Sequence, residues 1–242
     1  MKAKNKKRNI FLITAGCVFL AALTLGNTFA YLTDNDNADN VFTIGDVYLK
    51  IEEPNYPKQE SSRIMVAYSK ISKDPMITNT GTNDEFVFMK VTVPLENVTL
   101  VGTDGKKDTE TKKQEIFKLI STSTGAIEYD EDFSYNPSWL FIDEDSTDDT
   151  HSYIFAYKKV LLASGNTDTE IRTKTETLFD EVQLKSFIEG EIPENTVEKI
   201  EIEAYGIQAD NLFSIDNLDP DNPTEEQLEE IYEIYVRQNG GT

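Results

Sequence analysis

The residues that could carry catalytic chemistry are few, because the 242-residue chain contains one histidine, His151, and one cysteine, Cys17. The common zinc proteases hold their metal with two histidines four residues apart on a helix, beside a glutamate. Carboxylates alone would make a poor zinc site, since zinc favours nitrogen and sulfur ligands. A serine-hydrolase triad would need His151 as its base, and no Gly-x-Ser-x-Gly turn accompanies it. We therefore predict that His151 is an ordinary residue at a loop edge and that the chain has no catalytic or metal site.

Three acidic segments offer the oxygen ligands that calcium prefers: 34–39, 143–145 and 219–221. In segment 34–39, Ala38 occupies a position at which an EF-hand loop needs a ligand. Neither 34–39 nor 143–145 is followed by a glycine and a distal glutamate at the EF-hand spacing. Runs of charge are usually solvated. We expect solvated loops and no cofactor, with calcium bound at the acidic loops as the alternative.

The first thirty residues are typical of a secretory signal peptide. Five basic residues lie within the first eight positions, an uncharged apolar run covers 10–25, and small residues stand at Thr28 and Ala30. Cleavage is predicted between Ala30 and Tyr31. The 16-residue run is shorter than the ~20 residues that span a bilayer, so an uncleaved membrane anchor is the less favoured alternative.

The cysteine, Cys17, lies inside this apolar run, so the mature chain is expected to have no disulfide and no thiol chemistry. The segment 14–17 has some likeness to a lipoprotein cleavage box. The apolar run continues past Cys17, however, whereas a lipidated cysteine stands at the end of such a run. We therefore do not predict lipidation.

Removal of residues 1–30 leaves 18 Lys+Arg against 44 Asp+Glu, a formal charge of −26. Such a chain repels nucleic acid and anionic lipid, and we exclude both as partners. Residues 31–242 are enough for one sizeable core and too few to require two, so we predict a single domain.

Several alternating runs predict the strands that must position any site. The strongest is 85–94, where Val87, Met89, Val91 and Val93 share one face and Phe86, Phe88, Lys90 and Thr92 the other. Further strands are predicted at the ranges 41–51, 139–142, 151–162, 181–188 and 197–209, with a bulge at Gly206 and a loop at 143–149.

Two helices are predicted. Apolar residues at helical offsets favour a short helix at 114–120, with a strand interrupted by a bulge as the alternative. A helix at 223–238 is predicted to begin with Asn222 as its cap and Pro223 in its first turn. Its apolar stripe, Leu228, Ile231, Tyr232 and Tyr235, is expected to pack on the domain. Many short strands with one or two short helices predict a mainly β fold, an antiparallel β-sandwich.

Five segments follow one another over most of residues 28–213: TFAYLTDNDNADNVFTIGDVYLKI, DPMITNTGTNDEFVFMKVTVP, SYIFAYKKVLLASGNT, TLFDEVQLKSFIEG and IEIEAYGIQADNL. Their order resembles the TasA/camelysin family, and within it the BsaA-type biofilm matrix proteins that depend on the signal peptidase SipW. Gly206 departs from the pattern, in which a residue such as alanine is expected. The resemblance implies a jelly-roll-like sandwich and a Gram-positive source.

It also implies a secreted structural subunit, not an enzyme, that forms extracellular fibres of a biofilm matrix. Cleavage at Ala30–Tyr31 would free a segment that could complete the sandwich of the next molecule by donor-strand exchange. We expect residues 31–44 to form this polymerisation strand, through Tyr31, Leu32, Val41, Phe42 and Ile44. The partners implied are the chain itself, the dedicated signal peptidase, and an accessory or anchoring matrix protein. A camelysin-like surface metallopeptidase and a monomeric surface adhesin are the alternatives.

Overall fold

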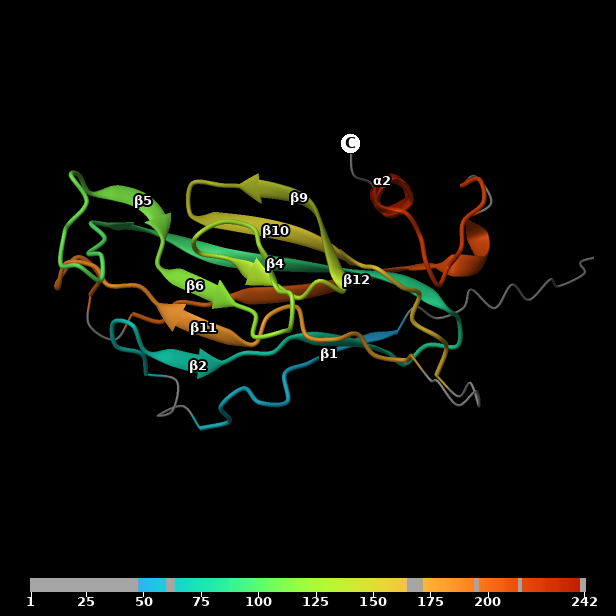
Figure 1. Cartoon of the computed structure of the whole chain (residues 1–242), viewed down its shortest axis with the longest axis horizontal. Helices are drawn as coiled ribbons and strands as arrows, with labels where there is room; N and C mark the ends of the chain where they lie inside the picture. The colour runs from blue at the N-terminus through green and yellow to red at the C-terminus, as the bar shows by residue number, and fades with distance from the viewer. Residues whose placement is uncertain (1–47, 60–63, 165–171, 194–195, 213–214, 240–242) are drawn as a thin grey trace, which may run out of the picture. The chain divides into compact units, whose positions relative to one another are not determined.

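The computed structural model describes residues 48–59, 64–164, 172–193, 196–212 and 215–239 (Figure 1). All of them belong to one of the two units into which the chain divides, Gly45–Thr242. The predicted signal peptide and the predicted polymerisation strand lie outside the described residues.

The first layer is an antiparallel sheet in the order β12-β4-β10-β9. Its central strand, β4 (Glu85–Val98), lies between β12 (Glu201–Gln208) and β10 (Thr150–Tyr157). β9 (Trp139–Ser146) pairs with β10 at one edge, and β5 (Lys112–Glu115) pairs with the last residues of β4. β12 forms the other edge.

The alternation of β4 separates two clusters of buried residues, as the sequence predicted. Val87, Met89, Val91 and Val93 face the main core, which also contains Trp139 and Phe155. Phe86 and Phe88 face the opposite side and pack beneath the C-terminal helix. All six β4 side chains are fully buried, because each face of this strand is covered by another layer.

The second layer covers the main core. β1 (Leu49–Glu52) pairs with β3 (Met76–Asn79), while β11 (Glu181–Leu184) lies between β2 (Lys70–Ser72) and β6 (Phe117–Ile120). An isolated antiparallel bridge between Thr78 and Lys174 joins β3 to the chain that leads into β11. The fold is therefore mainly β, and the predicted antiparallel sandwich is confirmed.

A short hairpin made of β7 (Ile127–Glu128) and β8 (Ser134–Tyr135) lies between the two layers on one side. Phe133 next to β8 is almost fully buried and bridges to Leu119 of β6. Its ring contacts the rings of Tyr153 and Phe155 at centroid distances of 5.0 and 5.3 Å. The hairpin thus closes this side of the sandwich.

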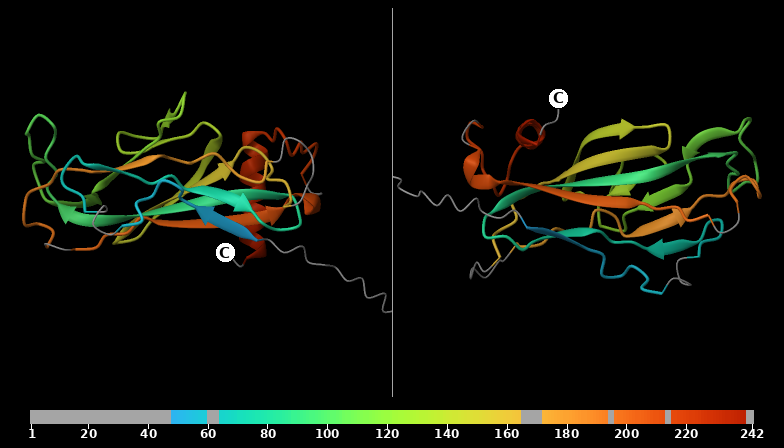
Figure 2. Two further views of the ribbon diagram at one scale, coloured as in Figure 1. Left: turned by 90° about the horizontal axis from the view of Figure 1, so that it is seen from below. Right: turned by 180° about the vertical axis from the view of Figure 1, so that it is seen from behind.

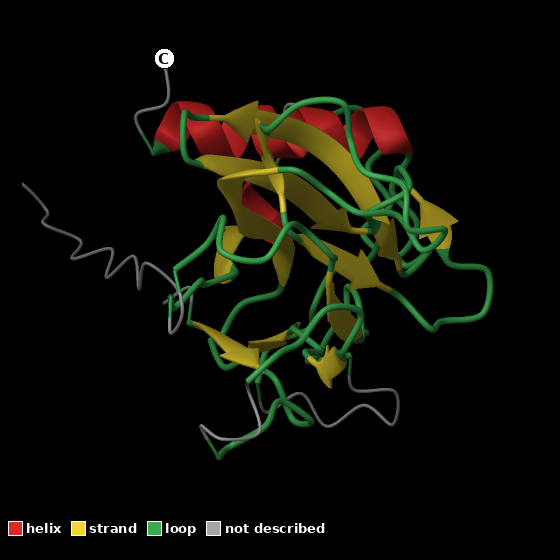
Figure 3. Ribbon diagram, turned by 90° about the vertical axis from the view of Figure 1, so that its left-hand side faces the viewer, coloured by secondary structure: helices red, strands yellow, loops and turns green. Residues whose placement is uncertain are grey.

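The helix α2 (Glu225–Gln238) lies on the outer face of the large sheet (Figure 3). Leu228 and Ile231 are buried there, and Phe88 contacts the rings of Tyr232 and Tyr235, which confirms the predicted packing stripe. A single turn of 3-10 helix, η2 (Ala209–Asn211), follows β12.

The predicted start of this helix is wrong by two residues. Thr224 is the N-cap, and it forms a capping box in which its hydroxyl accepts from the Gln227 N–H while the Gln227 side chain accepts from the Thr224 N–H. Pro223 therefore precedes the cap, and Asn222 lies further outside the helix. The Thr-x-x-Gln pattern was present in the sequence and marks the boundary better than Asn-Pro.

Three other local predictions are wrong. Residues 114–120 are not helical: the segment is extended, as in the alternative, but it contains two separate strands, β5 and β6, which pair in different sheets. β9 continues through Ser146 and takes up half of the predicted loop at 143–149. The pairing of β12 with β4 runs past Gly206 without a change of register, so no bulge occurs there.

Candidate functional site

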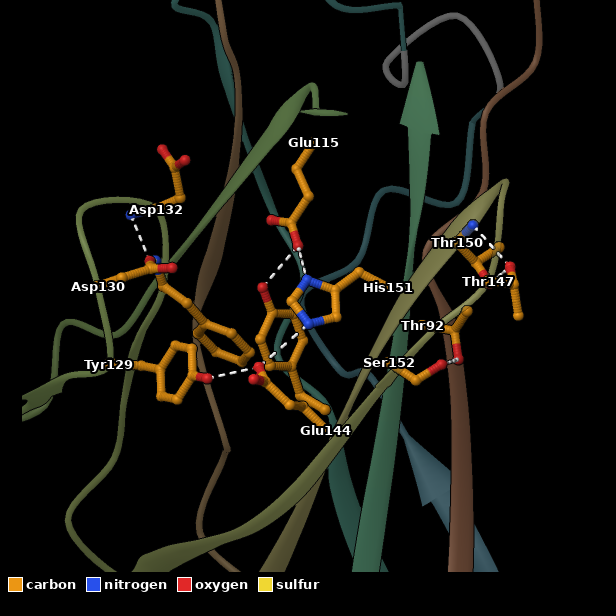
Figure 4. Close-up of polar contacts among 12 residues, drawn as sticks. Thr92, Glu115, Tyr129, Asp130, Asp132, Glu144, Thr147, Thr150, His151 and Ser152 are labelled. Atoms are coloured by element: carbon orange, nitrogen blue, oxygen red, sulfur yellow. Dashed lines mark hydrogen bonds and ion pairs between the residues drawn. The ribbon is translucent and has the colours of Figure 1, made fainter. Parts of the chain in front are cut away.

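The one histidine, His151, lies at the centre of a polar cluster on β10 (Figure 4). Its Nδ1 is 2.8 Å from Glu115 Oε1 on β5, and its Nε2 is 3.2 Å from Glu144 Oε2 on β9. Two tyrosine hydroxyls donate to the same carboxylate oxygens: Tyr153 to Glu115 and Tyr129 to Glu144, each at 2.5 Å. The cluster therefore links β5, β9, β10 and the chain beside β7.

Hydrogen bonds hold the two glutamates of this cluster in place. Each glutamate oxygen that faces a ring nitrogen of His151 also accepts from a tyrosine hydroxyl. The hydrogen bond from Tyr129 and the proximity of His151 lower the pKa of Glu144. Burial, together with the hydrogen bonds to glutamate, raises the pKa values of Tyr129 and Tyr153, so both hydroxyls keep their protons and donate.

His151 is the second residue of β10, so its place near a loop edge is as predicted, but its side chain has more contacts than the sequence indicated. The side chain is 21% exposed, and both nitrogens are engaged by glutamates from two different strands. The sequence could not show this, because Glu115 and Glu144 are 36 and 7 residues away in the chain. Both ring nitrogens are engaged, so we call this cluster the polar latch: it connects β5, β9 and β10 at the edge of the sheet, and its Glu144 accepts the hydrogen bond of Tyr129.

The acidic segments considered for calcium are dispersed. Residues 143–145 lie on β9 rather than in a loop, and Asp221 forms an ion pair with Arg172. Segment 34–39 lies outside the described residues. Within the parts of the chain that the structure describes, no group of three or more histidine, cysteine, aspartate or glutamate side chains could hold a metal ion.

All residues predicted to take part in cleavage or polymerisation (Ala30, Tyr31, Leu32, Val41, Phe42 and Ile44) lie outside the described residues. What the structure does describe is the place where that segment joins the sandwich. Tyr48, the first described residue, accepts hydrogen bonds at its carbonyl from the N–H and the hydroxyl of Thr80, at 2.8 and 2.9 Å. Leu49 then begins β1.

The strands β1 and β12 lie next to each other, one from each layer (Figure 2). β1 pairs only with β3, and β12 only with β4, among the described strands. Each therefore presents one strand edge that no described strand pairs. We call this side of the sandwich, between β1 and β12, the open seam.

The core is incompletely covered at the open seam. Ile202 and Ala204 of β12 pack against the main core but are only partly buried. Their partners across the ladder, Val91 and Met89 of β4, are fully buried. Leu49 of β1 is likewise only partly buried. An edge strand whose inward side chains still meet solvent is a site at which a further strand could bury apolar area.

Large apolar side chains are exposed near three strands, β1, β2 and β12. Tyr48 precedes β1 and Ile51 lies within it. Val197 lies in the chain that leads into β12. Three further residues precede β2: Ile64, Val66 and Tyr68. β2, like β1, is an outer strand of the second layer (Figure 1). In the described part of the chain these six are the large apolar residues that are exposed, with Val197 79% and Ile64 78% accessible.

One buried residue, Glu85, escaped the sequence reasoning. It is the first residue of β4, its side chain has 0% exposure, and neither carboxyl oxygen has a hydrogen-bond partner. Burial raises its pKa to about 7. Its position was visible in the alternation, because residue 85 shares the inward face with Val87 and Met89.

Comparison with protein-family models, with curated proteins and with solved structures found no match. No helix in the described residues has the length and apolar character needed to cross a membrane. The fold and the open seam define the class of molecule: a mainly β, antiparallel sandwich that is closed by the β7–β8 hairpin on one side and has, on the other, strand edges that no described strand pairs.

Proposed function

We propose that this protein is a secreted structural subunit that assembles head-to-tail into extracellular fibres by donating its N-terminal segment to the open seam of the next molecule. The observation that carries the proposal is the pair of adjacent strand edges, on β1 and β12, that no described strand pairs, above partly buried core residues. A strand added there gains backbone hydrogen bonds and covers exposed apolar surface.

The position of the N-terminal segment supports a contact between molecules. Residues 31–44 immediately precede the sequence that enters β1, so this segment is attached to the molecule at the seam. If the segment completes a neighbour instead of its own sandwich, each molecule gives one strand and receives one. Such a contact does not close on itself and extends into a filament.

The opposite edge of the large sheet is unsuited to the same role. β9 carries Asp143, Glu144 and Asp145 in succession along the edge, and charged residues on an edge strand oppose pairing with another chain. The β7–β8 hairpin also closes that side. Assembly through the open seam is therefore favoured over edge-to-edge pairing through β9.

The remaining parts of the proposal come from the sequence. The signal-peptide pattern of residues 1–30 places the mature chain outside the cell, and the resemblance to the TasA/camelysin family suggests a biofilm matrix at the surface of a Gram-positive bacterium. In this proposal a dedicated signal peptidase releases Tyr31, and an accessory matrix protein starts or anchors the fibre. The large negative charge keeps the subunit soluble until assembly.

Assembly is tested by electron microscopy and sedimentation of residues 31–242 and of the same chain without residues 31–44. We expect fibres from the first protein and dispersed particles from the second. A synthetic peptide of residues 31–47 should bind the shortened protein, and a peptide carrying Val41→Asp and Ile44→Asp should not. Normal fibres from the shortened chain would refute the strand-donation mechanism, and dispersed particles from both proteins would refute self-assembly and favour a monomeric adhesin.

A further inference from the structure

The carboxyl group of Glu85 lacks a hydrogen-bond partner in a place where such groups are costly. Its side chain has no exposure, and both oxygens are unpartnered. Buried polar side chains in folded proteins almost always have a partner, and an exception calls for a specific explanation. All other buried side-chain nitrogen and oxygen atoms in the described residues are satisfied, so the deficit is local to Glu85.

Glu85 lies at the end of the open seam where the N-terminal segment joins the sandwich. Across the ladder it opposes Gln208, the last residue of the edge strand β12. The β3–β4 turn that precedes it holds Tyr48 through Thr80. The side chain of Asn79, which opposes Leu49 of β1, donates to the carbonyl of Asn83 in the same turn. The turn before Glu85 therefore contacts the first described residues of β1.

The neighbouring polar groups are already engaged. Asn79 uses its amide on Asn83 and its oxygen on the Gly81 N–H. Asp84 accepts from the Ala163 N–H, at 2.7 Å. The backbone of Glu85 itself is paired with Leu161 in both directions. Among the described residues, these neighbouring groups are thus committed to other partners, and the carboxyl of Glu85 keeps an unused capacity to accept a hydrogen bond.

We propose that the donor comes from residues 31–44 of a second copy of this chain, and that Glu85 thereby sets the register of the inserted strand. This inference rests on the proposed function and names one residue of the receiving site. An added strand brings backbone N–H groups, and the segment also carries the Asn40 amide and the Thr43 hydroxyl. A register shifted by one residue exchanges the two faces of a strand, so a single buried acceptor is enough to discriminate between registers.

The test is the critical concentration for assembly of residues 31–242, measured by sedimentation for the wild-type chain and for Glu85→Leu, Glu85→Ala and Glu85→Gln. Leucine and alanine remove the acceptor, and glutamine keeps an acceptor oxygen. Glu230→Leu, the same change on the exposed side of α2, is the matched control. Circular dichroism establishes that each variant is folded.

We expect Glu85→Leu and Glu85→Ala to raise the critical concentration about tenfold or more, since one hydrogen bond to a buried acceptor is lost. Glu85→Gln and the control should stay within about threefold of the wild type. Assembly of both apolar variants at the wild-type concentration, or failure of Glu85→Gln to assemble, would overturn the inference and leave the proposed function standing. If the wild-type chain itself stays monomeric, the proposed function fails and this inference fails with it.

Discussion

Replacement of Glu85 by glutamine should change how the stability of the subunit depends on pH. Glutamine has nearly the same shape as the protonated carboxyl group and cannot ionise. Burial raises the pKa of Glu85 from 4.5 to about 7, because the charged form loses hydration without gaining a partner. In the unfolded chain the same group ionises at its ordinary pKa.

The magnitude follows from the difference between these two values. The folded pKa lies about 2.5 above 4.5, and each pKa unit corresponds to ~1.36 kcal/mol, which gives about 3 kcal/mol. The folded state holds the proton more tightly, so this contribution to stability is fully present below about pH 4.5 and is lost as the pH rises to about 7. Above that pH the wild-type monomer carries the whole penalty.

The assay is urea denaturation of monomeric residues 31–242 and of Glu85→Gln at several pH values between 4.5 and 8. The difference between the two unfolding free energies removes the contribution of the other carboxylates. We expect the two proteins to be similar near pH 4.5 and the variant to be more stable by about 2–3 kcal/mol at pH 8. The control Glu230→Gln, on the exposed face of α2, should show no such trend. Parallel stability curves for Glu85→Gln and the wild type would refute the reasoning.

Three further substitutions probe the rest of the sandwich by denaturation at neutral pH. His151→Ala removes the contacts to Glu115 and Glu144, so it should lower the unfolding free energy by about 1–3 kcal/mol. A loss below about 0.5 kcal/mol would mean that the polar latch contributes little to stability. Leu228→Ala should cost about 2–5 kcal/mol, because this side chain is 1% exposed on the inward face of α2; a surface-like effect would show that the helix is only loosely attached. Thr224→Ala should cost about 1 kcal/mol through loss of the capping box, and Thr224→Ser, which keeps the hydroxyl, should stay close to the wild type.

Local patterns predicted the fold class well because they report on which side of a strand is buried. The alternation of residues 85–94 correctly assigned two faces to β4, and the stripe at Leu228 and Ile231 correctly assigned the packing face of α2. Both rest on contacts between a regular element and a large apolar layer, which need no knowledge of the exact partner. The same reasoning failed at 114–120, where apolar residues on two consecutive short strands imitate the spacing of a helix.

The candidate site depended much more on the tertiary structure. A lone histidine in sequence says nothing of the two glutamates that approach it, because they come from other strands and reach it only when β5, β9 and β10 pair. The open seam likewise is a property of two layers, since β1 and β12 belong to different sheets and become neighbours only when the sheets pack.

The sequence alone determined the chemistry that is available: one imidazole, no cysteine in the predicted mature chain, a large excess of carboxylates, and an N-terminal segment that leads into a strand. It also determined the strand faces, because burial alternates with the backbone geometry. Only the tertiary structure decided which edges of the sheets remain unpaired and that Glu85 is sealed without a hydrogen-bond donor. Both features depend on which strands become neighbours. Strand pairing joins segments that are far apart in the chain through backbone N–H and C=O groups, which nearly all residue types share, so the sequence does not mark the partners.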